Sequence, residues 1–474
     1  QRIIILLLML NKKNKFLKFQ NRNFSINSKK VKKNDIFFAI EGSKQSGNLY
    51  SSEALSRGAY KVVTSKNIRN KNYIIVKNVR KFLAEVCSVK YKEKPKNIIA
   101  VTGTNGKSSV AHFYFQILKN LKINSAAIGT LGVFYKNKVK KTNLTTPDII
   151  TIHKELNFLK RNKIDNVCLE ASSHGLHQNR LDSINFKVGI FTNFTQDHLD
   201  YHKNLKNYLK AKLYLFSSLL KKNSFAIIDS DIPEYSIINK ICKKRKIKVL
   251  SFGSKGNTIK LISHHFLGKQ QVIKINFLDK IYNIRINLIG DFQIKNLFAA
   301  ILASYVSIKN PNKIINTLPK IRSATGRMQC VGYKKQSAVV VDYAHTPDAL
   351  KKSLQTLSKQ FNKKVDVVFG CGGDRDKGKR YKMGKIADQF ASKIYLTNDN
   401  PRSENPISIV KQIKKGCLRS KVILDRKIAI KSAIQNLNSG SILLIAGKGH
   451  ENYQIIKNKK KYFSDQKVSK FFLK

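Results

Sequence analysis

The chain is organised around one short stretch, Ile98-Ile99-Ala100-Val101-Thr102-Gly103-Thr104-Asn105-Gly106-Lys107-Ser108-Ser109. Its apolar first half is typical of a buried strand, and its glycine-containing second half is typical of a tight loop that leads into a helix. Such a loop turns backbone N–H groups toward a phosphate chain. Lys107 can reach the terminal phosphates, and the hydroxyl of Ser108 or Ser109 can coordinate Mg²⁺. The stretch therefore predicts a nucleoside-triphosphate site, although Val101 stands where the longer form of this loop has its first glycine.

The length and hydropathy of the chain indicate a multidomain protein with no membrane span. A chain of 474 residues is too long for one hydrophobic core and suggests about two to four domains. The apolar run at 3–10 is shorter than the ~20 residues that cross a bilayer, and no small-residue cleavage site follows it. We expect it to form the apolar face of a first helix.

The formal net charge of +63 is extreme. Taken alone it favours a nucleic-acid partner, because Lys and Arg neutralise phosphates and release counterions. However, Lys far outnumbers Arg and is spread along the whole chain, whereas bidentate readers of bases and phosphates are usually arginines. We attribute the charge to compositional drift toward Lys, Asn and Ile, and expect no specific nucleic-acid binding.

The cysteines favour a reducing compartment. The 6 cysteines lie far apart and form no C-x-x-C pair. This spacing argues against a zinc site and against a disulfide framework. We expect a cytoplasmic protein.

Alternating strand and helix patterns divide the chain into three α/β segments, with the first boundary at the charged, proline-containing linker 92–96. The expected strands are 35–40 and 59–63 in the first segment; 98–102, 166–170, 188–192 and 225–228 in the second; and 338–342, 365–369, 393–397 and 441–445 in the third. A helix is expected over 51–58, and β-hairpins over 253–290. The pattern predicts a central, mostly parallel sheet with helices on both faces and a Rossmann-like C-terminal segment.

Polar side chains follow two strands of the middle segment. Glu170 ends one expected strand, and His198 comes shortly after another. Because ligands collect beyond the carboxyl ends of parallel strands, a carboxylate and an imidazole meeting the loop 103–109 would suit a divalent ion that bridges phosphates. Taken singly, Glu170 could instead be a helix N-terminal charge and His198 a hydrogen-bonded core histidine. His198 and His202 lack the H-E-x-x-H pattern, so zinc is not expected.

The third segment carries residues suited to an amino acid. Asp342 follows a strand and could accept hydrogen bonds from a ribose, or could cap the next helix. Arg375 and Arg402 could clamp a carboxylate in bidentate fashion, and Glu451 could hold an ammonium group. The alternative is that these residues lie in solvated loops.

With these motifs, the chain resembles the Mur ligase family over nearly its whole length. The resemblance is carried by the runs 103–108, 170–176, 192–193, 197–202, 326–328, 341–350, 370–380, 399–402 and 447–451. It implies an ATP-dependent amide ligation in peptidoglycan precursor synthesis. ATP would phosphorylate the D-glutamate side-chain carboxylate of UDP-N-acetylmuramoyl-L-alanyl-D-glutamate, and the amine of meso-2,6-diaminopimelate would attack the acyl phosphate, with Mg²⁺ neutralising charge.

The resemblance also implies a domain plan. Residues 1–95 would bind the UDP-linked substrate, residues 96–325 would form the ATP-binding ligase domain, and residues 326–474 would form a Rossmann-like domain for the incoming amino acid. The resemblance is compatible with a monomer, which is what we expect.

The resemblance assigns residues to ATP and Mg²⁺. The ATP contacts would be Gly103, Thr104, Asn105, Gly106, Lys107, Ser108, Ser109, Asn296, Arg327 and Asp342. The Mg²⁺ ligands would be Ser108, Glu170, His198 and Lys212, and the catalytic residues Lys107, Glu170, His198 and Lys212. Lys212 matches a lysine that family members carry as a carbamate, which turns a cation into an anion. Apart from the resemblance, Lys212 reads as a solvated helix residue.

The substrate contacts implied by the resemblance fall into two sets. The UDP-linked substrate would contact Ser28, Ser43, Lys44, Gln45, Thr145, Thr146, Ser172, Gln178 and Arg180. Diaminopimelate would contact Arg375, Asp399, Asn400, Pro401, Arg402, Gly447 and Glu451. Arg402 would set the specificity, because its positive fork suits the distal carboxylate that diaminopimelate has and lysine lacks.

Five positions depart from the family pattern, and four alternatives stay open. Lys29 with Asn27 flanks Ser28 where Asp-Ser-Arg is common, and Leu144, Gln293 and Ser109 replace a frequent Asn, Asn and Thr. The alternatives are a lysine-adding Mur ligase, a folate-polyglutamylating relative, a basic ATP-using nucleic-acid-binding protein and an inactive scaffold. The run 399–402 argues against the first two, and the intact loop 103–109 with Glu170, His198 and Lys212 argues against the last.

Overall fold

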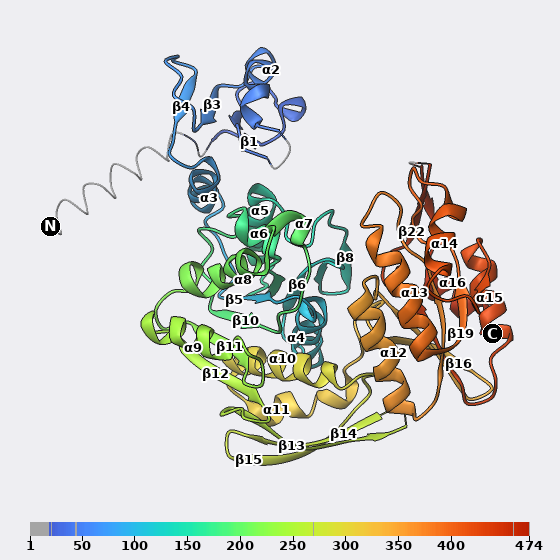
Figure 1. Cartoon of the computed structure of the whole chain (residues 1–474). Helices are drawn as coiled ribbons and strands as arrows, with labels where there is room; N and C mark the ends of the chain where they lie inside the picture. The colour runs from blue at the N-terminus through green and yellow to red at the C-terminus, as the bar shows by residue number, and fades with distance from the viewer. Residues whose placement is uncertain (1–18, 20, 43–44, 269, 458, 474) are drawn as a thin grey trace. The chain divides into compact units, whose positions relative to one another are not determined.

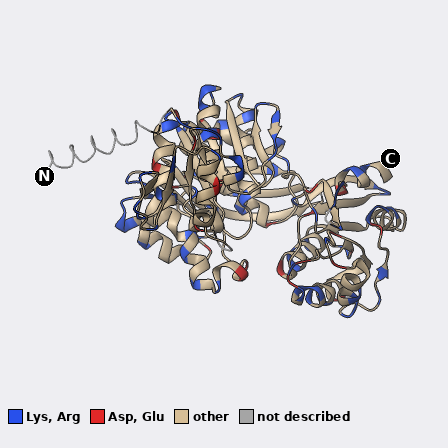
Figure 2. Cartoon of the chain, turned by 90° about the horizontal axis from the view of Figure 1, so that it is seen from above, with Lys and Arg blue, Asp and Glu red and all other residues tan. Residues whose placement is uncertain are grey.

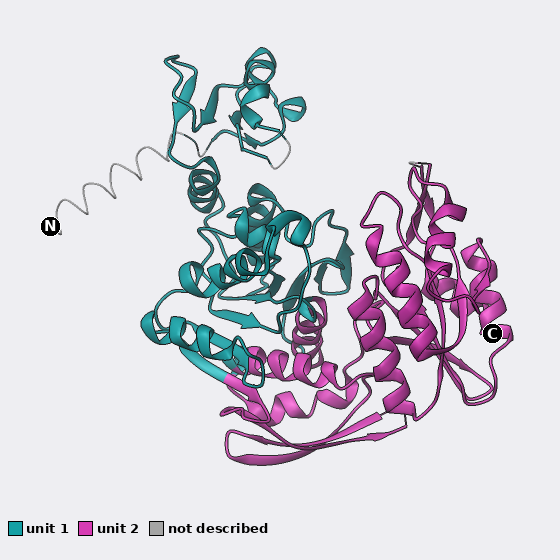
Figure 3. Cartoon of the chain, in the orientation of Figure 1, with its two compact units in different colours: residues 1–107, 122–250, 306–308 teal, residues 108–121, 251–305, 309–474 magenta. Residues whose placement is uncertain are grey.

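The computed structural model describes residues 19, 21–42, 45–268, 270–457 and 459–473. The apolar run 3–10 and the predicted contacts Ser43 and Lys44 lie outside these residues. The chain divides into two compact units (Figure 3): unit 1 comprises 1–107, 122–250 and 306–308, and unit 2 comprises 108–121, 251–305 and 309–474. No described helix is long and apolar enough to cross a membrane.

Unit 1 begins with a small parallel sheet in the order β1-β2-β3-β4 (Figure 1). Its strands are β1 (Phe24–Ser25), β2 (Ile36–Phe38), β3 (Lys61–Thr64) and β4 (Tyr73–Ile75), and its helices are α2 (Ser51–Ser56) and α3 (Val79–Lys90). Alternate residues of β2 point to opposite faces, as the strand period requires. Phe38 packs with Leu83 of α3, whereas Phe37 packs with Ala54 of α2. The two helices therefore cover opposite faces of this sheet.

The larger sheet of unit 1 is mostly parallel and has the order β12-β11-β10-β5-β9-β6-β7-β8. The strands are β5 (Asn97–Thr102), β6 (Ser125–Gly129), β7 (Gly132–Tyr135), β8 (Lys138–Lys140), β9 (Asn166–Glu170), β10 (Val188–Phe191), β11 (Phe225–Asp229) and β12 (Lys248–Gly253). β5 lies between β9 and β10, runs parallel to both, and is buried along its whole length. The phosphate-type loop thus leaves the middle of the sheet.

Helices and loops join the strands of this sheet. They include α5 (Ile149–Arg161), α6 (Ser173–His177), α7 (Leu199–His202), α8 (Leu205–Tyr214), a π-helical turn (Leu215–Leu219) and α9 (Tyr235–Lys244). Ile98 and Ala100 of β5 pack into one core with Leu156 of α5 and Ile238 of α9. Burial of these apolar faces holds the strands in place, and with them the polar segments that follow β5, β9 and β10.

Unit 2 contains an antiparallel series and a set of helices. β13 (Ile259–Leu267), β14 (Gln270–Phe277) and β15 (Lys280–Ile286) pair in sequence, as expected for 253–290. Three helices from the middle of the chain also belong largely to unit 2. They are α4 (Lys107–Asn120), α10 (Phe292–Ile308) and α11 (Pro311–Ile315). α4 follows the phosphate-type loop, as predicted.

The C-terminal sheet of unit 2 has the order β16-β17-β21-β18-β19-β20 (Figure 1). The strands are β16 (Gln329–Lys334), β17 (Ser337–Asp342), β18 (Val365–Phe369), β19 (Ala391–Leu396), β20 (Lys421–Val422) and β21 (Ile442–Ala446). All neighbouring pairs are parallel except β16 with β17. A hairpin of β22 (Tyr453–Ile456) and β23 (Lys459–Tyr462) forms a separate small sheet.

Helices cover both faces of this sheet. They are α12 (Pro347–Phe361), α13 (Gly378–Phe390), α14 (Pro406–Lys414), α15 (Arg426–Gln435) and α16 (Asp465–Phe472). Val340 of β17 packs into the core that contains Leu354 of α12, whereas Val341 packs into the core that contains Ile430 of α15. The predicted α/β class, with mostly parallel sheets and helices, is confirmed.

Some elements differ from the sequence prediction. The strands β6, β7 and β8 over 125–140 are not predicted; β6 runs parallel to β9, and β7 and β8 follow it in antiparallel pairing. The helix expected over 51–58 ends at Ser56. Figure 2 shows Lys and Arg on helices, strands and loops of both units rather than on one element. The positive charge is therefore distributed over the chain.

Candidate functional site

Gly103 opens the phosphate-type loop directly after β5. Its φ is +141°, and a Cβ atom here would lie 1.9 Å from Oγ1 of Thr192. That threonine hydroxyl donates to the carbonyl of Asn105 at 2.6 Å, and the Asn105 N–H donates to Oδ1 of Asn193 at 2.9 Å. The segment after β10 thus braces the loop, and only glycine fits at its start.

Two lysines meet at the carbonyl of Gly103. Nζ of Lys107 donates to this oxygen at 2.9 Å and to the carbonyl of Thr104 at 2.7 Å. Nζ of Lys212, from α8, donates to the same Gly103 oxygen at 2.7 Å. The structure therefore brings two predicted residues that are far apart in sequence to one carbonyl of the phosphate-type loop.

Lys212 is a buried lysine, and only 1% of its surface is exposed. Its Nζ lies 4.3 Å from the centre of the Tyr208 ring. Burial, and secondarily the charge of Lys107, hold the pKa of Lys212 well below its usual value. The neutral amine, which is the nucleophilic form, is therefore favoured at this position. The sequence context, which resembles a solvated helix, gave no signal of this burial.

Glu170 ends β9 and is buried. Its carboxylate accepts from the backbone N–H of Thr130 at 2.9 Å and from the Thr130 hydroxyl at 3.2 Å. A Cβ atom on Gly129 would lie 2.0 Å from Oε1 of Glu170. The end of β6 therefore packs closely against the carboxylate and fixes its position.

His198 precedes α7 and has a left-handed backbone, with φ of 52°. Burial lowers the pKa of this imidazole; Lys107 and Lys212 lower it further, while Asp197 raises it. The neutral imidazole is the form that coordinates metals. The ring centres of His198 and His174 lie 4.9 Å apart. Among the described residues, no group of three or more His, Cys, Asp or Glu side chains is arranged to hold a metal ion.

The predicted contacts to the sugar and peptide form one cluster in unit 1. The Thr146 hydroxyl donates to the Glu170 carbonyl at 2.7 Å and lies 2.9 Å from the Ser172 hydroxyl. Arg180 donates to the Thr146 carbonyl at 2.7 Å and to Oε1 of Gln178 at 2.6 Å. The cluster adjoins the strand end that carries Glu170.

The other predicted substrate contacts in unit 1 lie at two places. The Thr145 hydroxyl is 3.0 Å from the Thr130 hydroxyl, next to Glu170. Ser28 begins a short 3₁₀ helix after β1 and is buried, and Gln45 accepts a hydrogen bond from Tyr50. Ser28 and Gln45 belong to the small N-terminal sheet region.

In unit 2, the predicted amino-acid contacts form a second cluster. Nδ2 of Asn400 donates to Oε2 of Glu451 at 2.9 Å. Nζ of Lys448 donates to Oδ1 of Asn400 and to Oε2 of Glu451, both at 3.1 Å. Lys448 is fully buried and had no predicted role. The sequence feature that could have indicated a role for Lys448 is its position between Gly447 and Gly449, just after a buried strand.

Arg402 lies beside two glycine-containing loops and has a positive φ of 54°. Its Nη1 donates to the Gly373 carbonyl at 2.6 Å. A Cβ on Gly372 would lie 2.9 Å from this Nη1 and 3.8 Å from Cγ of Arg375. Both arginines therefore flank Gly372, and a Cβ on Gly447 would lie 2.8 Å from Oδ2 of Asp399.

Asp342 does not cap the following helix, because the N-cap of α12 is Thr346. Its two oxygens instead accept from the backbone N–H of Met328 and from the Ser353 hydroxyl, both at 2.9 Å. The Arg327 guanidinium lies 4.5 Å from the Tyr343 ring centre.

Asn296 is buried on α10 and donates to Oε1 of Gln293 at 3.0 Å. Gln293, a departure from the family pattern, thus supports Asn296 directly.

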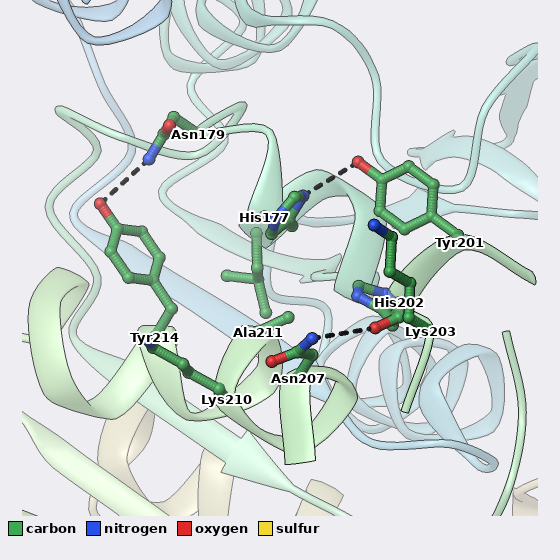
Figure 4. A pocket seen from close by; sticks show the side chains of 10 residues that line it. His177, Asn179, Tyr201, His202, Lys203, Asn207, Lys210, Ala211 and Tyr214 are labelled. Carbon is green, nitrogen blue, oxygen red and sulfur yellow. Dashed lines mark hydrogen bonds between the residues drawn. The ribbon is translucent and has the colours of Figure 1, made fainter. Parts of the chain in front are cut away.

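A pocket of about 430 Å³ lies between α6, α7 and α8 (Figure 4). Its lining residues include His177, Tyr201 and His202, and none of the predicted site residues. The Tyr201 hydroxyl lies 3.0 Å from Nδ1 of His177 and accepts from Nε2 of Gln178 at 3.0 Å. The pocket is thus next to the sugar and peptide cluster.

The braced glycine loop after a central strand and the α/β architecture define a nucleotide-binding α/β protein. The family model of the Mur ligase middle domain matches residues 101–304. The model of the Mur ligase glutamate ligase domain matches residues 326–449. The chain belongs to the Mur ligase family.

Individual relatives extend the similarity to almost the whole chain. A protein of Rickettsia bellii named UDP-N-acetylmuramoyl-L-alanyl-D-glutamate–2,6-diaminopimelate ligase is 43% identical over 464 residues, covering 96% of both chains. A protein of the same name from Wigglesworthia glossinidia brevipalpis is 39% identical, covering 95% of this chain and 94% of that protein.

Solved structures share the fold. A structure described as UDP-N-acetylmuramoyl-L-alanyl-D-glutamate–2,6-diaminopimelate ligase has a TM-score of 0.71 and 31% identity, covering 95% of this chain and 94% of that chain. A folylpolyglutamate synthase of Mycobacterium tuberculosis has a TM-score of 0.63 and 16% identity, covering 78% of this chain and 92% of that chain. The second similarity shows the common fold alone.

Proposed function

We propose that this chain is the ATP-dependent, ADP-forming ligase that joins meso-2,6-diaminopimelate to the D-glutamate of UDP-N-acetylmuramoyl-L-alanyl-D-glutamate in peptidoglycan precursor synthesis. The relatives that are similar over almost the whole chain carry this name. One observation supports this proposal most strongly: Lys107 and the buried Lys212 both donate to the carbonyl of Gly103. The proposed phosphate-binding loop therefore has a second lysine beside it, and this lysine can lose its proton.

The reaction requires an activated carboxylate. An oxygen of the D-glutamate side chain attacks the γ-phosphorus of ATP, ADP leaves, and an acyl phosphate forms. The amine of diaminopimelate then attacks the acyl carbon and loses a proton, and inorganic phosphate leaves. The loop N–H groups and the Lys107 ammonium would stabilise the charge on the phosphates during transfer.

The donor set fits Mg²⁺ if Lys212 is carbamylated. Glu170 supplies a buried carboxylate, His198 a neutral imidazole, and Ser108 a hydroxyl at the start of α4. The lowered pKa of Lys212 favours the neutral amine that reacts with CO₂. A carbamate is anionic and would complete an oxygen-rich site of the kind that Mg²⁺ prefers. When bound, Mg²⁺ would neutralise charge on the phosphates.

The cluster around Glu451 would hold the incoming amino acid. Arg402 and Arg375 flank Gly372 and would bind the distal carboxylate of diaminopimelate. Lys448 and Asn400 fix the Glu451 carboxylate, which would then accept from the substrate ammonium. Asp399, Pro401 and Gly447 would shape the same pocket. Lysine lacks the distal carboxylate, so Arg402 favours diaminopimelate.

The remaining predicted residues would bind ATP and the UDP-linked substrate. For ATP these are Thr104, Asn105, Gly106, Ser109, Asn296, Arg327 and Asp342; for the UDP-linked substrate they are Ser28, Ser43, Lys44, Gln45, Thr145, Thr146, Ser172, Gln178 and Arg180. The hydrogen bonds among Thr146, Ser172 and Arg180 support a common role for these three residues.

We also propose the domain boundaries 1–95, 96–325 and 326–474. Separate sheets at 24–75 and within 329–446 support the first and third domains. We further propose that the enzyme is cytoplasmic and monomeric.

The direct test is product formation. Purified protein with Mg²⁺, ATP, UDP-N-acetylmuramoyl-L-alanyl-D-glutamate and meso-diaminopimelate should yield a product with the mass of the two substrates joined with loss of water. Folded protein that forms no such product would refute the proposed function.

A further inference from the structure

We propose that Arg80, together with Arg180, binds the diphosphate of the UDP-linked substrate. This inference rests on the proposed function, because that function supplies a substrate with a diphosphate. Arg80 lies in the first turn of α3 and belongs to none of the sequence motifs. It would therefore be an additional binding residue in unit 1.

Arg80 connects two segments that are predicted to contact opposite ends of the substrate. Its Nη2 donates to the carbonyl of Glu41 at 2.9 Å, in the segment that leads toward Gln45. Its Nη1 donates to the carbonyl of Gln178 at 3.4 Å, two residues before Arg180. The guanidinium thus links the segment predicted to contact the uridine of the substrate with the segment predicted to contact its sugar and peptide.

The two guanidinium groups lie close enough to repel each other, and the charge of Asp148 offsets part of that of Arg180. In the part of the chain that the structure describes, neither Arg80 nor Arg180 forms an ion pair with a carboxylate. Burial and the nearby charge of Arg180 lower the pKa of Arg80, and burial lowers the pKa of Arg180. Both side chains stay charged at neutral pH. An anion between them would relieve their repulsion.

The chemistry of the substrate identifies that anion. Its diphosphate is the covalent link between the uridine and the sugar that bears the peptide. A substrate that contacts Gln45 at one end and Arg180 at the other must therefore carry its diphosphate past Arg80. A guanidinium has more N–H groups than the two carbonyls use, and its planar fork suits phosphate oxygens.

The experiment compares two replacements of Arg80 that separate charge from hydrogen bonding. Arg80→Lys keeps the positive charge, whereas Arg80→Gln keeps a donor for the Glu41 and Gln178 carbonyls and loses the charge. The matched control is Arg57→Gln, which removes an exposed arginine paired with Glu53 in the same region. Calorimetry measures the Kd of UDP-N-acetylmuramoyl-L-alanyl-D-glutamate at low and high salt, and melting temperatures verify folding.

We expect Arg80→Gln to weaken substrate binding about tenfold or more, in line with loss of a charged hydrogen bond. Arg80→Lys should retain more affinity than Arg80→Gln, Arg57→Gln should bind like the unmodified protein, and the salt dependence of Kd should be smaller in Arg80→Gln. The KM for ATP should not change.

Two results would overturn the proposal. If Arg80→Gln binds as tightly as the unmodified protein, Arg80 does not contact the diphosphate. If Arg80→Gln retains more affinity than Arg80→Lys, Arg80 only holds the two carbonyls together. Failure of the unmodified, folded protein to bind the substrate would instead refute the proposed function, and the two failures are thereby distinguished.

Discussion

At the scale of single residues, the centre of the proposed site is held by the carbonyl of Gly103. Lys107 and Lys212 both donate to it, and the Cβ-free surface of Gly103 receives the Thr192 hydroxyl. Two ammonium groups at one oxygen repel each other, so a buried lysine here loses its proton more readily than a surface lysine. The same environment that suits phosphates therefore also suits reaction of Lys212 with CO₂.

Lys212→Ala should be nearly inactive, because the anion that completes the proposed metal site is lost. A small anion such as chloride or bicarbonate, which can occupy the space of the missing carbamate, should restore part of the activity. With ¹³C-bicarbonate, the unmodified protein should give a carbamate NMR signal that is absent in Lys212→Ala. Lys210→Ala, an exposed lysine on the same helix, should keep both the signal and the activity. Full activity of Lys212→Ala would contradict the carbamate role.

Arg402→Lys should raise the KM for diaminopimelate by about tenfold or more, because a lone ammonium cannot form the two parallel hydrogen bonds of a guanidinium. The KM for ATP should stay the same. Arg419→Lys, which changes an exposed arginine paired with Asp388, serves as the control. An unchanged KM for diaminopimelate in Arg402→Lys would contradict the proposed pocket.

His153 should make stability depend on pH. Burial, helped by Lys94, lowers the pKa of this fully buried imidazole from 6.5 to about 3. Between pH 6.5 and about 3, His153 is protonated in the unfolded chain but not in the folded protein. The free energy of unfolding therefore decreases as the pH falls through this range. At pH 5 the loss is about 2 kcal/mol.

The melting temperatures at pH 7 and pH 5 test this pH dependence. The decrease should be smaller for His153→Leu than for the unmodified protein, whereas His265→Leu, an exposed histidine, should not change it. An equal decrease in His153→Leu and the unmodified protein would show that His153 does not cause the pH dependence.

At the scale of elements, the buried parallel strands were predictable, and the positions of several side chains were not. β5 and β21 are continuous apolar runs that parallel sheets favour. The sequence prediction missed β6, which is buried and runs parallel to β9, and the antiparallel strands β7 and β8 that follow it, of which β8 is exposed and rich in lysine. The burial of Lys212 and Lys448 depends on contacts with Gly103 and Glu451. The first contact joins residues that are far apart in sequence, and the second lies within one loop. The hydrophobic periodicity of the sequence predicts neither of them.

A buried ion pair joins the starts of α15 and α16. Nε of Arg426 donates to Asp465 at 2.8 Å, and its Nη2 donates to the Ala446 carbonyl at 2.9 Å, directly before Gly447. Asp465→Asn leaves a buried guanidinium without its counter-charge, so it should cost about 3–5 kcal/mol of unfolding free energy.

Urea denaturation measures the effect of this pair. Asp388→Asn, which breaks an exposed pair with Arg419, should cost only about 0–1 kcal/mol. The double variant Arg426→Met with Asp465→Leu should be more stable than Asp465→Asn, because no charge is left unpaired. Equal losses for Asp465→Asn and Asp388→Asn would contradict this account.

At the scale of the whole molecule, the family and the α/β class could be predicted because ordered motifs lie along nearly the entire chain. The predicted phosphate-binding residues occupy one contiguous loop, so their grouping is local. Arg80 could not be predicted, because its relation to Gln178 and Arg180 arises only when the first small sheet packs with the second part of unit 1. The Lys and Arg residues behind the net charge of +63 lie on many helices, strands and loops (Figure 2).

We expect this protein to catalyse a ligation that uses ATP and selects diaminopimelate. The most direct measurement is ADP release by purified protein with Mg²⁺, ATP and UDP-N-acetylmuramoyl-L-alanyl-D-glutamate, comparing meso-diaminopimelate with L-lysine. We predict ADP release with diaminopimelate and none above background with lysine. Equal release with lysine would contradict the role of Arg402, and no release with either amino acid, in folded protein, would contradict the ligase function itself.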